Sequence, residues 1–318
     1  MVQTRVIVRA GSSIQENSST AYKSDKLQAR RQLLNRCSVR DFLFAYETTI
    51  RLIAFCGVFV AFAVLEFALP LRKQAIGRGW RWPNNLGVVV LDTVLVRILF
   101  PTTAVGLAFL AETRGFGFFN AFSVEPWLSV VASVVVLDFA IYLQHVLFHA
   151  VPGLWRLHRM HHSDLEFDVS TGLRFHPIEI LLSMLIKLAV VAAIGAPPLA
   201  VLVFEVLLNA TSIFNHANIR VPDKVDRVLR WFVVTPDMHR VHHSILVRET
   251  NSNFGFNLPW WDRLFGTYRA QPAAGHEAMT IGVEQFRDPG DLRMDRMMLQ
   301  PFLGDVGRYP IGQRDADQ

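Results

Sequence analysis

The stretch WLSVVASVVVLDFAIYLQHVLFH, residues 127–149, decides the fold expected for this chain. Its first 22 residues contain one charged side chain, that of Asp138, and a helix needs about 20 apolar residues to cross a bilayer. Its last turn carries His145 and His149, and side chains four positions apart lie on one face of a helix. We therefore predict a membrane span that ends in two adjacent imidazole groups.

Four other apolar runs accompany this one. Residues 52–69 and 86–110 are long enough to cross a bilayer, whereas residues 178–194 and 199–214 are shorter and are joined by Gly195-Ala-Pro-Pro198, which stops a helix and turns the chain. The chain is 51% hydrophobic and 19% charged, with a mean hydropathy of +0.28, which is too apolar for an average soluble enzyme. We expect an all-α fold: an integral membrane helical bundle of about three spans plus a helical hairpin, with a cytoplasmic histidine-rich cap.

Three regions of the chain differ in composition. Residues 1–41 form a polar, basic N-terminal extension, residues 42–270 hold the apolar runs and the histidine boxes, and residues 271–318 form a polar tail. The first region has no short apolar core followed by a cleavage site, so we expect no cleaved signal peptide. The two cysteines, Cys37 and Cys56, are too few for a disulfide-stapled scaffold or a thiolate metal site. The net charge of +5 lacks a basic stripe interleaved with aromatic residues, so we expect no nucleic-acid partner.

The basic residues between the apolar runs predict the orientation in the membrane. The connection 71–85 holds four Lys or Arg residues and the connection 111–126 holds one, so the positive-inside rule places the first connection in the cytoplasm. Counting spans forward puts the histidines on the cytoplasmic face as well. The same count places the basic N-terminal extension outside, unless the first apolar run is re-entrant or interfacial, and the sequence leaves this conflict open.

Eight of the eleven histidines lie in three short boxes. The boxes are His145-x-x-x-His149, His158-Arg-Met-His161-His162 and His239-Arg-Val-His242-His243. The last two share one spacing, in which positions i, i+3 and i+4 converge from each segment. One His-x-x-His-His has a chance expectation of about 0.01 per chain of this composition, so two copies are very improbable by accident. They predict two metal ions held by similar half-sites.

The number of histidines says more about the site than their chemistry does. Imidazole suits iron, zinc, copper and nickel, so ligand type does not select the metal. A structural zinc ion needs four ligands, whereas eight or more favour a two-metal centre. His216, where the hairpin ends, is the expected ninth ligand, with an interfacial histidine as the alternative. His176, before Pro177, is either a ligand, a group that supports a ligand, or the residue at which a helix begins.

Two acids inside the apolar runs are in line with histidines. The helical stripes that they begin are Asp138, Tyr142, His145, His149 and Glu205, Asn209, Ser212, His216. Ionisable side chains within membrane helices are costly and usually functional, and metal-bound histidines usually donate their other N–H to a carboxylate or carbonyl. We predict that Asp138 and Glu205 support ligands, with a contact that only fixes helix packing as the alternative.

The boxes resemble those of the fatty acid hydroxylase and sterol desaturase superfamily of membrane di-iron proteins. In that family a His-x-x-x-His box precedes two His-x-x-His-His boxes, as it does here between residues 145 and 243. The resemblance extends to residues 174–179, 214–218, 251–255 and 261–268, and it covers roughly residues 52–302. We expect residues 251–268 to fold back over the site, although their Trp and Phe side chains are explained equally well as interfacial anchors.

The resemblance implies a centre of two iron ions (Fe2+/Fe3+) with O2 as cosubstrate, and no catalytic residue beyond the metal centre is predicted. The candidate ligands are His145, His149, His158, His161, His162, His216, His239, His242 and His243. Candidates for a further ligand or a group that supports one are His176, Asp138, Glu205 and Asn218.

The resemblance also implies the partners. The substrate is a lipid of the bilayer, such as a fatty acyl chain, sterol, hopanoid or carotenoid, which is hydroxylated or desaturated at a C–H bond. The chain has no haem or flavin motif, so the electrons come from a separate donor: a ferredoxin, a cytochrome b5 or a reductase. The expected location is a bacterial inner membrane or one of the endoplasmic reticulum type.

Two other functions stay open at this stage. A membrane metal carrier or store would spread its ligands along the depth of several spans, whereas these histidines gather on one side. A zinc-dependent membrane hydrolase would need three ligands and a general-base glutamate, as in His-Glu-x-x-His, and no box contains one. The sequence does not decide the lipid, the carbon that is attacked, or the oligomeric state.

Overall fold

The computed structural model describes residues 41–311 of the chain, and these divide between a unit that ends at Leu52 and a compact unit that begins at Ile53. Within the described range every regular element is a helix, and the two isolated β-bridges, Pro70–Ile219 and Ser244–Ile281, belong to no strand. The prediction of an all-α fold is therefore confirmed. The extension 1–40 and residues 312–318 lie outside the described residues.

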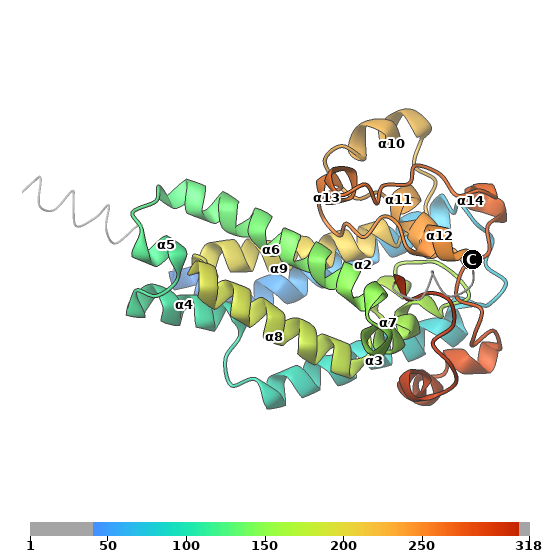
Figure 1. Cartoon of the computed structure of the whole chain (residues 1–318), viewed down its shortest axis with the longest axis horizontal. Coiled ribbons are helices and arrows are strands. Elements are labelled where there is room, and N and C mark those ends of the chain that lie inside the picture. Colours follow the sequence, from blue (N-terminus) through green and yellow to red (C-terminus); the bar gives the residue numbers. More distant parts are fainter. Residues whose placement is uncertain (1–40, 312–318) are drawn as a thin grey trace, which may run out of the picture. The chain divides into compact units, whose positions relative to one another are not determined.

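Five stretches of helix are long and apolar enough to cross a membrane, which confirms the predicted spans and hairpin. The helices that form them are α2 (Glu47–Ala68), α3 (Arg78–Leu99, continued by α4, Ala104–Arg114, and α5, Phe118–Ala121), α6 (Pro126–Ala150), α8 (Pro177–Ile194) and α9 (Pro198–Asn215). Helix α6 packs against both α8 and α9, and α4 packs against the same pair, so the three long helices α6, α8 and α9 run side by side (Figure 1).

The second apolar run departs from its predicted form, which was a single span over residues 86–110. Helix α3 begins eight residues earlier, at Arg78, and the run breaks after Leu99. Pro101 explains the break, because the residue before a proline is pushed out of the helical region, and Phe100 is extended at φ −109°, ψ 111°. Thr103 then caps α4 by accepting a hydrogen bond from the Gly106 N–H at 3.0 Å.

The hairpin of α8 and α9 forms as its sequence predicts. Gly195 ends α8 in the left-handed conformation, at φ 61°, and its N–H donates to the Val191 carbonyl. Pro198 is the first residue of α9, where its missing N–H costs nothing. The hairpin therefore returns the chain to the end of the bundle that carries α7.

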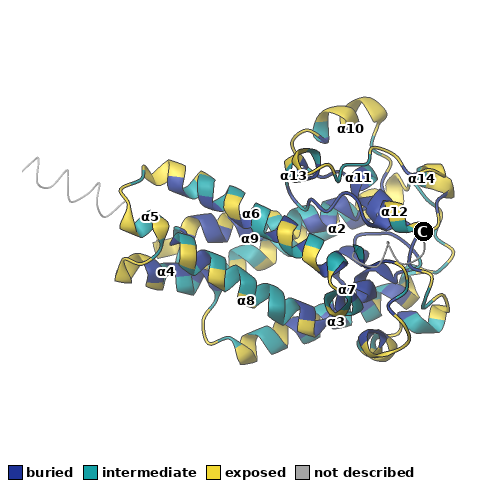
Figure 2. Cartoon of the chain, in the orientation of Figure 1, coloured by how far each residue is buried: buried dark blue, intermediate teal, exposed yellow. Residues whose placement is uncertain are grey.

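A cap of short helices and loops covers that end of the bundle. Its elements are α7 (Pro152–His162), η1 (Thr171–Leu173), α10 (Asp223–Leu229), α11 (Pro236–His242), α12 (Val247–Thr250), α13 (Trp260–Leu264), α14 (Gly275–Ala278), η2 (Pro289–Leu292), α15 (Met294–Leu299) and η3 (Gln300–Phe302). Buried residues concentrate around α7, α11 and α12, whereas the bundle helices expose much of their apolar surface (Figure 2). Exposed apolar side chains along helices of this length are expected where lipid surrounds them.

The C-terminal region is part of this cap and not a separate polar tail. The Arg159 guanidinium donates to the carbonyl oxygens of Gln300 and Asp305, at 2.5 Å each, and the Trp155 indole N–H donates to that of Val306 at 3.2 Å. Tyr309 is fully buried. The boundary expected after residue 270 is not seen, because residues beyond it bind the helix that carries one of the histidine boxes.

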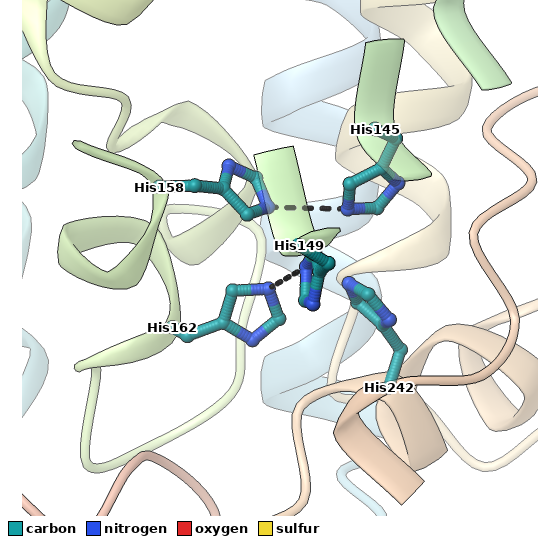
Figure 3. Close-up of side chains that lie close together, drawn as sticks. All are labelled: His145, His149, His158, His162 and His242. Carbon is teal, nitrogen blue, oxygen red and sulfur yellow. Dashed lines mark hydrogen bonds between the residues drawn. The ribbon is translucent and has the colours of Figure 1, made fainter. Parts of the chain in front are cut away.

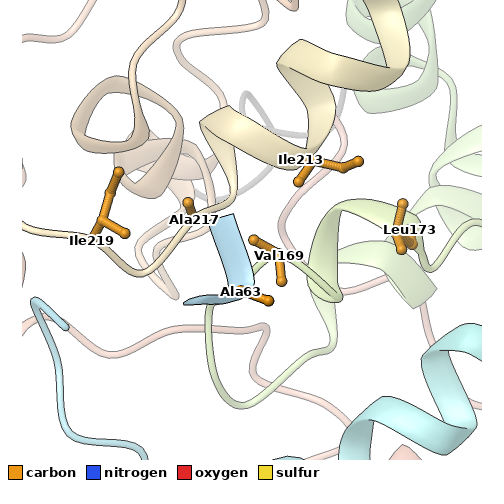
Figure 4. Close-up of a cluster of buried hydrophobic side chains, with 6 residues drawn as sticks. All are labelled: Ala63, Val169, Leu173, Ile213, Ala217 and Ile219. Carbon is orange, nitrogen blue, oxygen red and sulfur yellow. The ribbon is translucent and has the colours of Figure 1, made fainter. Parts of the chain in front are cut away.

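A small apolar cluster joins the bundle to the cap. Its members come from α2, from the loop around η1 and from the end of α9 (Figure 4): Ala63, Val169, Leu173, Ile213, Ala217 and Ile219. Beside it, the Glu66 carboxylate accepts hydrogen bonds from the backbone N–H groups of Val169 at 2.8 Å and Asn218 at 2.7 Å. These contacts hold the segment after the second box and the end of the hairpin together.

A buried ion cluster fixes the start of α3 against the chain that follows α7. Arg81 donates two hydrogen bonds to Asp164, at 2.9 and 2.8 Å, and one to Asp168 at 2.6 Å. Arg174 lies 3.6 Å from the same Asp164 carboxylate. Burial alone would raise the pKa of Asp164, but the two guanidinium groups hold it well below its usual range. These residues explain why α3 starts within a stretch whose charges predicted a connection.

Asp164→Ala should destabilise the protein strongly, because it leaves buried guanidinium charge without its main partner. Breaking a buried ion pair by removing one side typically costs about 3–5 kcal/mol. Denaturant or thermal unfolding in detergent measures the loss. The control is Asp295→Ala, which removes an exposed pair with Arg293 and should cost about 0–1 kcal/mol. Equal stability losses in both variants would contradict a structural role for the cluster.

Candidate metal centre

Four helices deliver the nine candidate ligands to one place. His145 and His149 lie on the last turns of α6, and His216 follows the last residue of α9. The other six come from α7 and α11, short helices that each begin with a proline at the first position. All nine side chains are buried.

The histidines form two groups in which the nearest ring nitrogens lie within 4.8 Å of one another. The first group is His145, His149, His158, His162 and His242, whose rings converge in Figure 3. The second group is His161, His216, His239 and His243. The structure therefore brings together all nine residues that the sequence proposed as ligands, in two sets.

Each His-x-x-His-His box is divided between the groups, whereas the spacing had suggested that its three rings converge. The first box gives its i and i+4 residues, His158 and His162, to the five-histidine group and its i+3 residue, His161, to the other. The second box does the reverse, with His242 as the i+3 residue that crosses over. At about 100° per residue, i and i+4 point within about 40° of each other, but i+3 and i+4 differ by about 100°. One helix can therefore serve two neighbouring ions.

The Nε2 atoms face one another at short range. In the five-histidine group, Nε2 of His145 lies 3.1 Å from that of His158, and Nε2 of His149 lies 3.2 Å from that of His162. In the four-histidine group, His216 Nε2 lies at the centre of three such contacts. These join it to Nε2 of His161 at 3.2 Å, His239 at 3.1 Å and His243 at 3.2 Å.

The outer ring nitrogens show which Nε2 atoms carry no proton. Backbone carbonyl oxygens lie beside Nδ1 of three histidines, so these nitrogens must donate. The pairs are His145 with Phe254 at 2.8 Å, His216 with Ser212 at 2.7 Å and His242 with Ser252 at 2.7 Å. A neutral imidazole that donates through Nδ1 presents a lone pair at Nε2.

Two side chains hold the outer nitrogens of two further histidines. The Asn251 amide donates to the Tyr309 carbonyl at 2.7 Å, which leaves its oxygen 3.1 Å from His149 Nδ1. The Glu179 carboxylate lies 2.6 Å from His158 Nδ1. Metal-binding histidines are usually oriented in this way, by an acceptor on the nitrogen that faces away from the ion.

The donor set fits a pair of transition-metal ions. Unprotonated Nε2 atoms about 3 Å apart cannot hydrogen-bond to each other, and His242 Nε2 is buried with no hydrogen-bond partner among the described residues. Buried nitrogens left in this state are costly, and a cation between them removes the cost. Five and four neutral imidazoles are ligands that suit iron, copper, nickel or zinc.

The histidines outside the spans stay neutral at physiological pH. Burial lowers the pKa of His158 to about 3. Burial first, and the neighbouring imidazoles second, also hold the pKa values of His161, His162, His239, His242 and His243 well below their usual range. Their lone pairs are therefore available near pH 7 without the loss of a proton.

Glu179 is the acid beside the site that the sequence did not single out. It lies in the first turn of α8, and the matched segment 174–179 contained it, but no spacing rule related it to His158, which is 21 residues earlier. Glu205, expected in such a role, pairs instead with Lys187 at 2.7 Å between α8 and α9.

Two of the other candidates hold the backbone of the cap and lie in neither group. His176 caps α8 by accepting the Ile178 N–H at 3.2 Å, which is the helix-entry role left open above. Asn218 binds the backbone of Arg72 through both ends of its amide, at 3.0 and 2.8 Å. Both residues support the site only through the fold.

Asp138 acts on the site through a loop. Its carboxylate accepts from the Trp261 indole at 2.8 Å and from the N–H groups of Asn257 and Leu258 at 3.3 Å. Asp262 accepts from the N–H groups at the start of the same loop, those of Phe254 and Gly255, at 2.7 Å each. The loop folds over the histidines as expected, because its carbonyl groups orient two of them.

Comparison with known proteins agrees with this geometry. Residues 130–267, which include all nine histidines, match the family described as fatty acid hydroxylase. Residues 130–267 form a fatty acid hydroxylase domain. The resemblance found in the histidine boxes is therefore confirmed.

Relatives of this fatty acid hydroxylase domain are oxidoreductases by name. An ornithine lipid hydroxylase of Rhizobium tropici is 28% identical over 286 residues, or 86% of this chain and 83% of that protein. An alkylglycerol monooxygenase of Homo sapiens is 30% identical over 46% of this chain, and a cholesterol 25-hydroxylase of Rattus norvegicus is 27% identical over 51%. The matches span only 32% and 53% of these two relatives. No solved structure gives a match.

His161→Ala and His242→Ala should each abolish turnover and lower the bound metal, while membrane insertion stays intact. Each variant removes the one ligand that its box contributes to the opposite group. Metal per chain, measured by elemental analysis, gives a readout that does not depend on activity. The control is His276→Ala, because His276 is a partly buried cap histidine outside both groups. Retained metal and activity in both test variants would contradict the ligand assignment.

Glu179→Ala should weaken metal binding by about 10–100-fold, the usual effect of removing an acceptor behind a histidine ligand. Glu179→Gln keeps an oxygen that can accept the His158 N–H and should restore most of the affinity. Competition with a chelator of known affinity measures the change. Glu277→Gln, which alters an exposed carboxylate, serves as control and should leave the metal affinity unchanged.

Proposed function

We propose that this protein is a di-iron membrane hydroxylase that uses O2 and external electrons to hydroxylate a C–H bond of a membrane lipid. The observation that carries the proposal is the pair of buried groups of neutral imidazoles at one end of the apolar bundle. Because α7 and α11 each supply ligands to both groups, two bound ions would be neighbours. Neighbouring ions suit a reaction in which several electrons reach one O2 molecule.

Iron is the metal that this proposal requires. When bound, it would supply the redox chemistry of O2 reduction and C–H oxidation, which zinc does not support. The reaction balances as one oxygen atom entering the C–H bond and the other leaving as water, with two electrons and two protons consumed. The relatives named as hydroxylases and monooxygenases favour this outcome over desaturation.

The chain itself would supply orientation and dryness. The acceptors behind Nδ1 of the histidines fix the ring planes, and Asp138 and Asp262 hold the loop that provides two of those acceptors. Complete burial of the nine histidines excludes bulk water, which would otherwise compete for open metal positions.

The electrons are proposed to come from a separate ferredoxin, cytochrome b5 or reductase. The sequence has no haem or flavin motif that could store them. The basic connection between the first two spans favours a cytoplasmic position for the histidine end, where such donors are found.

The proposed substrate is a lipid with a polar head group and a long apolar chain. An ornithine lipid hydroxylase matches most of both chains, so an acyl lipid with an amino-acid head group is the first candidate to test. The other relatives are named for alkylglycerol and cholesterol, which are also amphiphilic membrane lipids.

The arrangement of ligands argues against the two alternative functions. A carrier would need ligands along the bundle, whereas both groups lie at its capped end. A hydrolase would need a glutamate facing an open metal position, but Glu179 contacts His158 at the nitrogen that faces away from the group.

Protein purified without oxygen should contain about two iron ions per chain and consume O2 once reduced. Lipids incubated with it should gain the mass of one oxygen atom, and removal of iron by a chelator should abolish the gain. Elemental analysis, an oxygen electrode and lipid mass spectrometry measure the three effects. One zinc ion per chain without oxygen uptake would refute the proposal and favour the hydrolase.

A further inference from the structure

One part of the cap has an unusual surface. We call residues 223–232 and 260–268, which include α10 and α13, the aromatic lobe. It exposes large apolar side chains in a continuous set: Val225, Val228, Trp231, Phe232, Trp260, Leu264 and Phe265. Leu264 is 70% exposed and Phe232 65%. Exposed apolar patches of this kind on a protein surface mark contact with a membrane or a partner.

Helix α10 has its apolar side outward. Val225 and Val228 are exposed, whereas Asp226 between them is only 5% exposed and pairs with Arg230 one turn later. A short helix on a water-facing surface would normally bury the valines and expose the acid. The reversed pattern is the one expected where the surroundings are apolar.

Internal bonds hold the lobe in this form. The Trp260 indole donates to the Trp231 carbonyl at 2.7 Å, and the Arg263 guanidinium lies 4.0 Å from the ring centres of both Trp231 and Tyr268. Arg230 donates to the Tyr268 hydroxyl at 3.0 Å. The polar groups of the lobe are therefore turned inward, and this leaves the apolar side chains at the surface.

The lobe continues the lipid-facing surface of α6. Phe139 of α6 lies 4.7 Å from Trp261 and 5.9 Å from Phe265, measured between ring centres, and Tyr142 lies 5.6 Å from Phe265. Figure 1 shows α10 and α13 beside the capped end of α6. A helix of 25 residues is about 37 Å long, compared with about 30 Å for the hydrocarbon core, so the final turns of α6 lie near the membrane boundary.

We propose that the aromatic lobe inserts into the interfacial layer of the lipid bilayer beside α6. Trp and Phe side chains with Lys224, Arg227 and Arg263 close by are the composition that this layer favours. The occupant of the patch is thus a lipid surface, continuous with the lipid around the spans. A protein partner, such as the electron donor, is the alternative that the experiment separates.

The position of the lobe also bears on substrate entry, and this step rests on the proposed function. The Tyr142 ring lies 6.5 Å from that of Phe254, which lies 5.5 Å from the His145 ring. An aromatic path therefore joins the exposed Phe265 to the five-histidine group. A lipid lying beneath the lobe would have its chain beside this path while its head group stays at the surface.

Spin labels in nanodiscs test the insertion directly. Cys37 and Cys56 are replaced by serine, and single cysteines are introduced by Val228→Cys, Leu264→Cys and, as a control elsewhere on the cap, Glu284→Cys. The nitroxides at 228 and 264 should collide more often with O2, which concentrates in lipid, than with a water-soluble nickel chelate. The control should show the reverse order. Labels at 228 and 264 that behave like the control would overturn the proposal and leave the patch to a protein partner.

A pair of charge substitutions tests the link to substrate entry. Leu264→Asp should lower turnover severalfold on lipid in nanodiscs but not on the same lipid in detergent micelles. Leu246→Asp, at an exposed leucine outside the lobe, should lower neither. If both Asp variants behave alike, the lobe does not guide substrate. Because the spin-label result needs no turnover, it remains valid even if the proposed reaction is wrong.

Discussion

The structure depends on one electrostatic constraint: nine buried, neutral imidazoles direct their inner nitrogens at one another across about 3 Å. Without a cation these contacts would be unfavourable, because lone pairs would face lone pairs in a site that water does not reach. The constraint explains why so many side chains elsewhere are spent on orientation. It also explains why the pKa values of the histidines outside the spans lie far below those of free imidazole.

The support for the histidines is arranged in successive layers. Carbonyl groups of Phe254 and Ser252, together with the side chains of Glu179 and Asn251, hold the outer ring nitrogens. Behind them, Asp138 and Asp262 fix the loop between α12 and α13, while the Arg81 cluster fixes the chain after α7. Buried charge is costly near a membrane, so its use in these layers is consistent with a site whose geometry must be exact within tenths of an ångström.

The capped end of the bundle also explains how one fold can combine a polar centre with a lipid substrate. The histidines lie where the spans end, beneath a cap whose interior is rich in hydrogen bonds, yet α6 keeps an apolar surface a few residues before His145. The proposed interfacial position of the aromatic lobe extends that surface outward. A lipid chain would then reach the centre without crossing water, and the head group would not have to enter the protein.

The sequence by itself determined the all-α membrane fold, the hairpin and the family, because apolar length, proline and glycine positions, and histidine spacing are local properties. The nine histidines could be chosen for the same reason. Only the tertiary structure decided how each His-x-x-His-His box divides between two groups, since that depends on which helix face meets which neighbour. It also decided that Glu179 and not Glu205 lies behind a ligand, and that α3 breaks before Pro101. Contacts between residues far apart in the chain set these features, and no local spacing encodes them.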